Sequence, residues 1–121
     1  MGTTVNRGNA MSEVETLQHD NSFFRIRRDI LKMLYTFFKE YPYAQIELKD
    51  IEKECRTNTK DLNWNIVYLE KCGYIELGKS TESFPYVACS ASITAAGVDL
   101  AEDKKAFNKR FPVEDDHRPK S

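Results

Sequence analysis

The sequence predicts a single domain of the α+β class that is predominantly helical. Hydrophobic residues recur every three to four positions over several stretches, which is the spacing of the buried face of an α-helix. Two shorter stretches alternate between apolar and polar residues, as strands with one buried face do. Because a polar, Ser-rich segment joins these two stretches, we expect them to pair as a β-hairpin between helices. The length of 121 residues suits one domain with its own core.

The first and longest helix is predicted to run from Ser22, which can cap its start, to about Glu40. Pro42 has no amide hydrogen and cannot continue the helix. Leu31 and Phe38 lie beside the predicted buried face and make it wider than one small core requires. We therefore expect a second surface to pack there, either the C-terminal helix or another subunit.

The middle of the chain has a helix-turn-helix pattern. A brief strand is expected over residues 45–48, followed by a short amphipathic helix over 48–55. The polar turn 56–59 is rich in residues that cap helices, and a third helix follows it as far as Gly73, which can end it in the left-handed conformation. The predicted buried side of this third helix consists of Leu62, Ile66 and Leu69.

The hairpin strands are predicted over residues 74–77 and 86–93. Thr94 follows directly and is a good N-cap for a last helix, which we expect to reach Phe111 before a proline interrupts it. Gly97 stands where a capping box would have Glu or Gln. Its missing Cβ is expected to let this helix approach a neighbour closely.

The two ends of the chain differ in composition from its middle. Residues 1–21 contain few branched apolar side chains, and residues 112–121 are short and charged, so we predict flexible tails around a domain of residues 22–111. Residues 23–112 carry 15 basic and 13 acidic side chains, a formal charge of +2, whereas the whole chain has −1. This balance permits DNA binding without arguing strongly for it.

Composition also excludes several classes of protein. The apolar stretches are interrupted by charges well before the roughly 20 residues that span a bilayer, and no basic region followed by an apolar run begins the chain. We therefore expect a cytoplasmic protein without a membrane segment. The three cysteines, Cys55, Cys72 and Cys89, stand singly and have no metal-ligand spacing, which fits free thiols in a reducing compartment.

Catalysis finds little support in the sequence. His19 and His117 both fall in the predicted tails, where no packed shell would hold them for acid–base chemistry. The chain has neither a Gly-rich phosphate loop nor a nucleophile motif. We therefore predict that the protein is not an enzyme and has no metal site and no cofactor.

Two segments carry a resemblance to a known superfamily. Residues 69–76 read Leu-Glu-Lys-Cys-Gly-Tyr-Ile-Glu, and residues 93–100 read Ile-Thr-Ala-Ala-Gly-Val-Asp-Leu. They resemble the end of the recognition helix with the first wing strand, and the exit from the second wing strand, in winged helix-turn-helix proteins of the PadR-like, MarR-like and small phage or plasmid types. The resemblance covers about residues 22–111. It implies a small transcriptional regulator that binds duplex DNA as a homodimer.

The same resemblance places the third helix in the major groove of DNA. With its apolar stripe turned inward, Lys60 can pair with phosphate or guanine, and Asn63 can read adenine. The predicted contacts from this helix and its preceding turn are Arg56, Thr57, Asn58, Thr59, Lys60, Asn63, Trp64 and Tyr68. The predicted wing contacts are Lys79, Ser80 and Thr81, and further backbone contacts are expected from Arg25, Arg28 and Lys32, a face that can equally be simply solvated.

Two further expectations concern protein contacts. The predicted dimer interface joins the last helix to the first through Leu31, Phe38, Leu100, Phe107 and Phe111. The third helix has as many acidic as basic side chains and an aromatic centre, which leaves open a second interpretation. In it the winged helix is a protein–protein interaction module, and Trp64, Val67 and Tyr68 contact a partner protein. Burial of Trp64 would favour DNA binding, whereas an exposed apolar patch would favour the partner.

Overall fold

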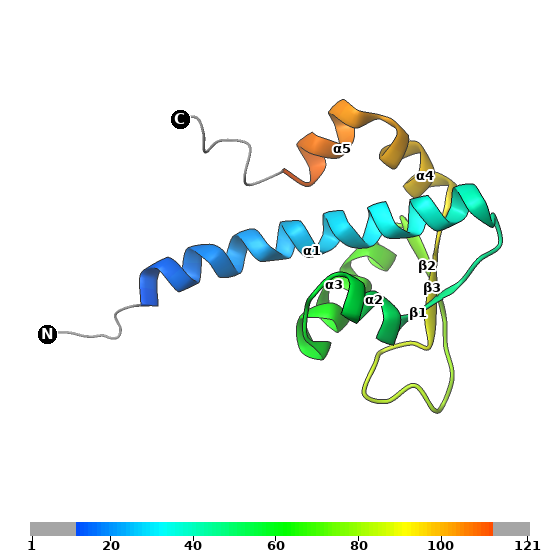
Figure 1. The fold of residues 1–121 in the computed structure, drawn as a ribbon, viewed down its shortest axis with the longest axis horizontal. Coiled ribbons are helices and arrows are strands. Elements are labelled where there is room, and N and C mark those ends of the chain that lie inside the picture. Colours follow the sequence, from blue (N-terminus) through cyan, green and yellow to red (C-terminus); the bar gives the residue numbers. More distant parts are fainter. Residues whose placement is uncertain (1–11, 113–121) are drawn as a thin grey trace, which may run out of the picture.

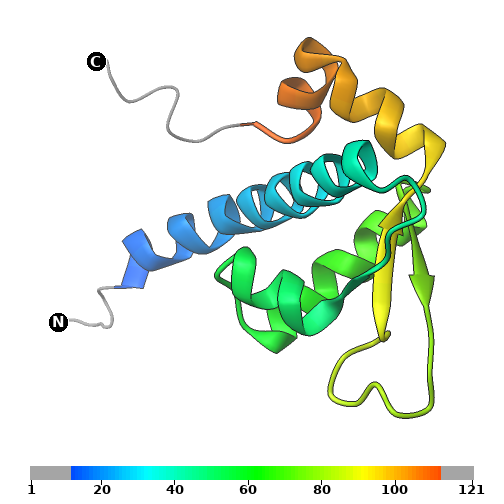
Figure 2. The same cartoon turned by 45° about the vertical axis from the view of Figure 1, so that its right-hand side comes forward.

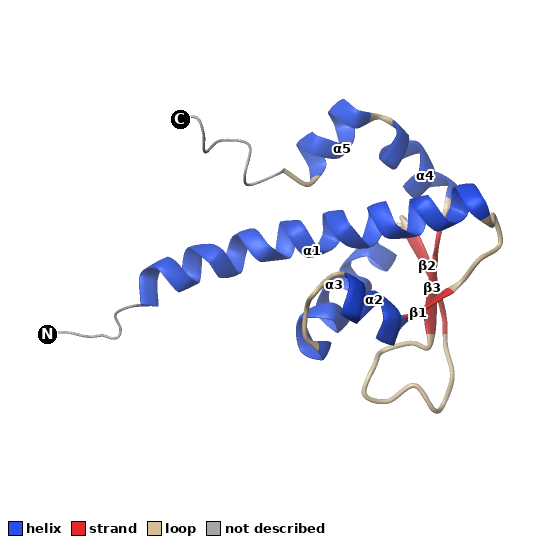
Figure 3. Ribbon diagram, in the orientation of Figure 1, coloured by secondary structure: helices blue, strands red, loops and turns tan. Residues whose placement is uncertain are grey.

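A computed structural model of the chain describes residues 12–112, with side chains from residue 23 onward. This part is α+β and mostly helical, with five helices and one three-stranded antiparallel sheet (Figures 1 and 3). The helices are α1 (Ser12–Glu40), α2 (Leu48–Glu54), α3 (Thr59–Lys71), α4 (Ala95–Glu102) and α5 (Lys104–Arg110). The strands are β1 (Ile46–Glu47), β2 (Ile75–Gly78) and β3 (Ser90–Ile93). The predicted class is confirmed.

Helix α1 begins earlier than predicted. It starts at Ser12 and includes Ser22, so the prediction that Ser22 caps the helix is wrong. Residues 12–21 of the predicted flexible tail are therefore helical; they contain no glycine or proline, and acidic residues near a helix start are favourable. The predicted end at Glu40 is confirmed. Figure 1 shows the N-terminal half of α1 extending beyond the rest of the domain. The remainder of the predicted tails, 1–11 and 113–121, lies outside the described residues.

The sheet has the strand order β1-β3-β2, and both neighbouring pairs are antiparallel. The predicted hairpin is confirmed, with Ile75 opposite Ile93. Its second strand begins at Ser90 and not at residue 86, because Tyr86 and Val87 bond to side chains of α2 and α3 instead of to a strand. Residues 79–89 accordingly form a long connection, which we call the hairpin loop (Figure 2).

The predicted last helix is two helices. Thr94 caps α4 as expected, because its hydroxyl accepts a hydrogen bond from the Gly97 amide at 3.1 Å. The helix then stops at Asp103, whose backbone is extended and whose carboxylate accepts from the Ala106 amide at 3.1 Å to begin α5. Aspartate is among the best N-cap residues, so Asp103 ends one helix and starts the next.

The core lies on both sides of α1. In Figure 1, α2 and α3 lie on one side of α1, and α4 and α5 lie on the other. The third helix turns Leu62, Ile66 and Leu69 fully inward, as predicted. None of the helices within residues 12–112 combines the length and apolarity needed to cross a membrane.

The predicted dimer interface is largely occupied within the chain. Leu31 and Phe111 are completely buried and Phe107 nearly so, all in the chain's own core, so the proposal that these three contact a second subunit is wrong. Of the two alternatives for the wide face of α1, the C-terminal helix fills it. Leu100 packs partly buried on the same core, and Phe38 is half-buried.

Candidate functional site

The turn between α2 and α3 is built from local hydrogen bonds. Asn58 caps α3 by accepting a hydrogen bond from the Asp61 amide at 2.8 Å. Arg56 has a φ of 53°, the left-handed conformation that reverses the chain tightly. The Thr59 hydroxyl donates to Glu52 at 2.8 Å, and Thr57 is half-buried. The turn thus orients α3, and two of its predicted DNA-contacting side chains, Asn58 and Thr59, also serve the fold.

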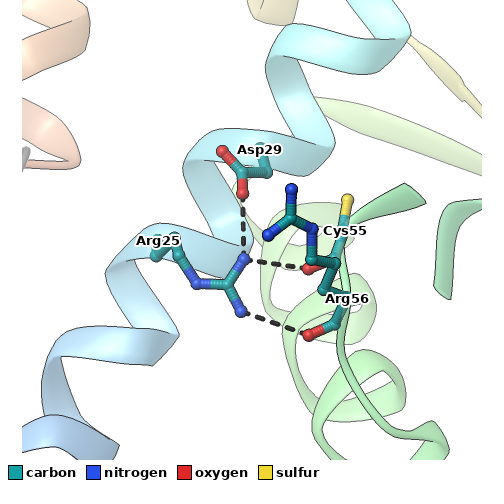
Figure 4. A network of polar contacts seen from close by, with 4 residues as sticks. All are labelled: Arg25, Asp29, Cys55 and Arg56. Atoms are coloured by element: carbon teal, nitrogen blue, oxygen red, sulfur yellow. Dashed lines mark hydrogen bonds and ion pairs between the residues drawn. The ribbon is translucent and has the colours of Figure 1, made fainter. Parts of the chain in front are cut away.

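Arg25 joins α1 to this turn (Figure 4). Its guanidinium pairs with Asp29 at 3.0 Å and donates to the backbone carbonyl of Cys55 at 2.9 Å. It also donates to the carbonyl of Arg56 at 3.4 Å. These carbonyls belong to the C-cap residue of α2 and to the residue after it, and the guanidinium satisfies them. Arg25, predicted to contact DNA, therefore holds α1 against the turn.

Arg28 has a similar role at the other side of α1. It donates to the side chain of Asn108 at 2.8 Å and to the backbone carbonyl of Phe111 at 3.1 Å, at the end of α5. Its guanidinium also lies 5.0 Å from the ring centre of Phe107. Of the three predicted backbone contacts on α1, Lys32 alone is left exposed without such a role among the described contacts.

Trp64 stands on the outward side of α3 and is 62% exposed. Its ring lies 6.1 Å from that of Phe23, and a groove of about 460 Å³ opens beside it. This groove, which we call the α3 groove, is lined by Arg27, Asn63, Trp64, Val67, Tyr68, Lys71 and Val87. Its lining includes two cations and no carboxylate. The central aromatic residue is therefore on the surface and not in the core.

Asn63 holds the hairpin loop against α3. Its amide nitrogen donates to the carbonyl of Pro85 at 3.0 Å, and its amide oxygen accepts from the backbone nitrogen of Val87 at 3.0 Å. The Tyr86 hydroxyl donates to Glu52 on α2, a second attachment. Both ends of the Asn63 amide thus hold the loop, a role within the chain that the sequence did not predict.

Tyr68 is half-buried between two arginines that the sequence interpretation did not include. The Arg27 guanidinium lies 3.8 Å from its ring centre, and Arg110 donates to its hydroxyl at 2.8 Å. Arg27 also donates to the side chain of Asn65, which is completely buried in α3, at 2.7 Å. A buried amide requires a hydrogen-bond partner. The sequence places Asn65 next to the buried residues of α3, and this was the signal that could have indicated a partner such as Arg27.

Several cations near α3 remain free for an external partner. Among the described residues the ion pairs are Arg25–Asp29 and Lys49–Glu47, so other basic side chains have no carboxylate within 4.0 Å in that part of the chain. The exposed cations on α3, its turn and the hairpin loop are Arg56, Lys60, Lys71 and Lys79. At the loop, Ser80 accepts from the Glu82 amide at 3.1 Å, while Thr81 is exposed.

The thiols differ strongly in exposure. Cys55 is buried, Cys72 is half-buried and Cys89 is exposed, and all three are free. Burial raises the pKa of the Cys55 thiol to about 12. Among the side chains that the structure describes, residues 23–112, no group of three metal-ligating side chains comes together.

Alkylation at pH 8 should therefore separate these thiols. We expect iodoacetamide to modify Cys89 fastest and Cys55 only as fast as the protein unfolds, since the thiolate is the nucleophile. Peptide mass spectrometry over time measures this, with all three reacting alike in guanidinium chloride as the control. The same burial links stability to pH. Because folding raises the pKa of the Cys55 thiol, the contribution of this thiol to the free energy of unfolding is complete below the pKa that it has in the unfolded chain. That contribution is lost as the pH rises toward 12. Equal labelling rates for Cys55 and Cys89 in the native protein would contradict the burial.

The outward side of α3 combines an apolar centre with basic ends, a pattern that suits a binding surface better than a catalytic one. Its shape depends on Asn63 and Tyr86, which attach the hairpin loop beside it. No protein-family model matches the chain, and neither a curated protein nor a solved structure matches it.

Proposed function

We propose that the chain is a winged-helix protein that binds duplex DNA, with α3 in the major groove and the hairpin loop as the wing. The element order α1-β1-α2-α3-β2-β3 supports the first part, because it is the order that the sequence resemblance implies. Helix α3 has 13 residues and is about 20 Å long, and the major groove is wide enough to admit a helix.

The observation that carries the proposal is the composition of the open side of α3. Lys60 and Lys71 are exposed there, and no carboxylate lines the adjoining groove. Phosphates surround the major groove on both strands, so cations at the two ends of a groove-bound helix are well placed to meet them. Arg56 in the turn and Lys79 at the start of the loop are further exposed cations.

The salt dependence of duplex binding tests this proposal. Four neutralised phosphates predict a log–log slope of about −3.6 for one copy, and about −7 for a homodimer. The double variant Lys60→Gln and Lys71→Gln should reduce the slope by about 2 per copy, measured by fluorescence anisotropy. Lys104→Gln is the matched control, since Lys104 is exposed on α5 across α1 from α3, and its slope should stay unchanged. Absence of duplex binding at low salt would overturn the proposal.

A role in transcription as a homodimer remains part of the proposal. The interface of such a homodimer, however, must use other surfaces, because Leu31, Phe107 and Phe111 are buried in the core of the single chain. Sedimentation in the presence and absence of duplex provides the copy number that the slope alone leaves ambiguous.

A protein partner on the same surface is the second candidate function. It is favoured by the 62% exposure of Trp64, because an exposed tryptophan beside an apolar groove is typical of interface anchors. In that case Trp64→Ala would weaken binding to the partner by about 2 kcal/mol or more, whereas Lys60→Gln would have a small effect. The two candidates thus differ in which side chain dominates.

A further inference from the structure

The side chains that could read bases by hydrogen bonding are mostly engaged inside the protein. Both ends of the Asn63 amide bind the hairpin loop. The Tyr68 hydroxyl accepts from Arg110, and its ring is stacked under Arg27. What remains between Lys60 and Lys71 on the open side of α3 is largely apolar.

The apolar part of this surface is continuous across two elements. Trp64 is exposed on α3, Val67 lies half-buried beside it, and Val87 adjoins them from the hairpin loop with 38% of its surface exposed. Val87 is held there because its own amide donates to Asn63 at 3.0 Å. Asn63 is therefore a positioning residue, and Val87 lines the α3 groove only while the hairpin loop is attached.

The major groove offers one apolar group, the C5-methyl of thymine. Other base edges present donors and acceptors, which lose hydrogen bonds to water without replacement when an apolar surface covers them. Such a surface therefore penalises guanine and cytosine and favours thymine. The charge of the groove fits the same ligand, because Lys71 lines it, is exposed and would face a phosphate. Arg27 also lines the groove, but its guanidinium is engaged by Asn65 and Tyr68.

We propose that Trp64, Val67 and Val87 form a slot for thymine methyl groups, so that DNA binding favours thymine at the base pairs facing the centre of α3. This inference rests on the proposed DNA binding. Trp64 is then a specificity-determining residue, and the lysines at the ends of α3 provide affinity that is independent of sequence.

Replacing thymine by deoxyuridine tests the inference, because it removes the methyl group and leaves base pairing and the O4 acceptor intact. Two otherwise identical A·T-rich duplexes are compared at one salt concentration. The protein should bind the thymine duplex about fourfold more tightly for one buried methyl and about fifteenfold for two. Trp64→Ala should bind both duplexes equally while keeping its salt slope. The control Tyr43→Ala, an aromatic residue that is 97% exposed and lines a different hollow, should keep the preference.

The outcomes separate this inference from the function on which it rests. Salt-dependent binding with equal affinity for the two duplexes overturns the thymine slot and leaves DNA binding standing. A thymine preference that survives in Trp64→Ala also overturns it. No salt-dependent binding to either duplex overturns both proposals and leaves the groove to a protein partner. Val67→Thr, which replaces one methyl group by a hydroxyl, provides a second variant and should reduce the preference at least twofold.

Discussion

Phe111→Ala is expected to lower the free energy of unfolding by about 3–5 kcal/mol. The Phe111 side chain is completely buried at the end of α5, where its ring meets those of Tyr74 at 6.5 Å and Phe107 at 6.0 Å, both edge-on. Truncation would remove these contacts and leave a cavity that the surrounding helices and sheet cannot fully close. Urea denaturation followed by circular dichroism measures the change.

Phe84→Ala is the matched control for this substitution. Phe84 is 92% exposed in the hairpin loop, so the same truncation there should change stability by less than about 0.5 kcal/mol. A loss below about 1 kcal/mol for Phe111→Ala would mean that α5 does not belong to the core. The position would then again be open to contact with a second subunit.

Gly97→Ala is expected to destabilise the protein by about 2–3 kcal/mol, although the same change within an ordinary helix stabilises it by about 1 kcal/mol. A Cβ at position 97 would lie 2.3 Å from the backbone carbonyl oxygen of Tyr74 and 2.6 Å from the side chain of Ile93. Backbone cannot move aside as a flexible side chain does, so α4 would have to separate from the start of the hairpin. Thermal or urea unfolding measures the sign as well as the size.

Two neighbouring substitutions test whether close approach is the cause. Ala96→Gly changes an exposed position of the same helix and should cost only about 1 kcal/mol through helix propensity. Gly73→Ala meets no atom within 4 Å, and its expected loss of about 1–2 kcal/mol comes from the φ of 84° alone. Stabilisation by Gly97→Ala would contradict the close packing of α4.

Close packing at Gly97 was predictable because the sequence motif isolates the residue. Thr94 marks the start of a helix, and a glycine three positions later lacks the side chain of a capping box. The same local chemistry predicted the C-terminal ends of α1 and α3 correctly, since Pro42 and Gly73 affect only the few residues next to them in the chain. Asp103 was missed, although it is an equally good cap, because the apolar spacing continues across it.

The candidate site was less predictable than the fold. A helical wheel correctly turned Leu62, Ile66 and Leu69 inward and left Lys60 and Trp64 outward. It could not indicate that the Asn63 amide forms hydrogen bonds with the hairpin loop, at residues 22 and 24 positions further along the chain. Nor could it place Arg27 and Arg110 around Tyr68, because those contacts span 41 and 42 residues.

By itself the sequence determined the α+β class, most helix and strand positions and the inward stripe of α3, because caps, turn residues and periodicity act over a few neighbouring residues. Only the tertiary structure decided what the exposed polar and aromatic side chains do. Leu31, Phe107 and Phe111, predicted to form a dimer interface, lie in the core. Arg25, Arg28 and Asn63, predicted to contact DNA, form hydrogen bonds that hold elements of the chain together. Trp64 was left open beside an apolar groove. Whether a side chain is free or hydrogen-bonded depends on residues that are far away in the sequence. Only the fold determines which of those residues lie next to it in space.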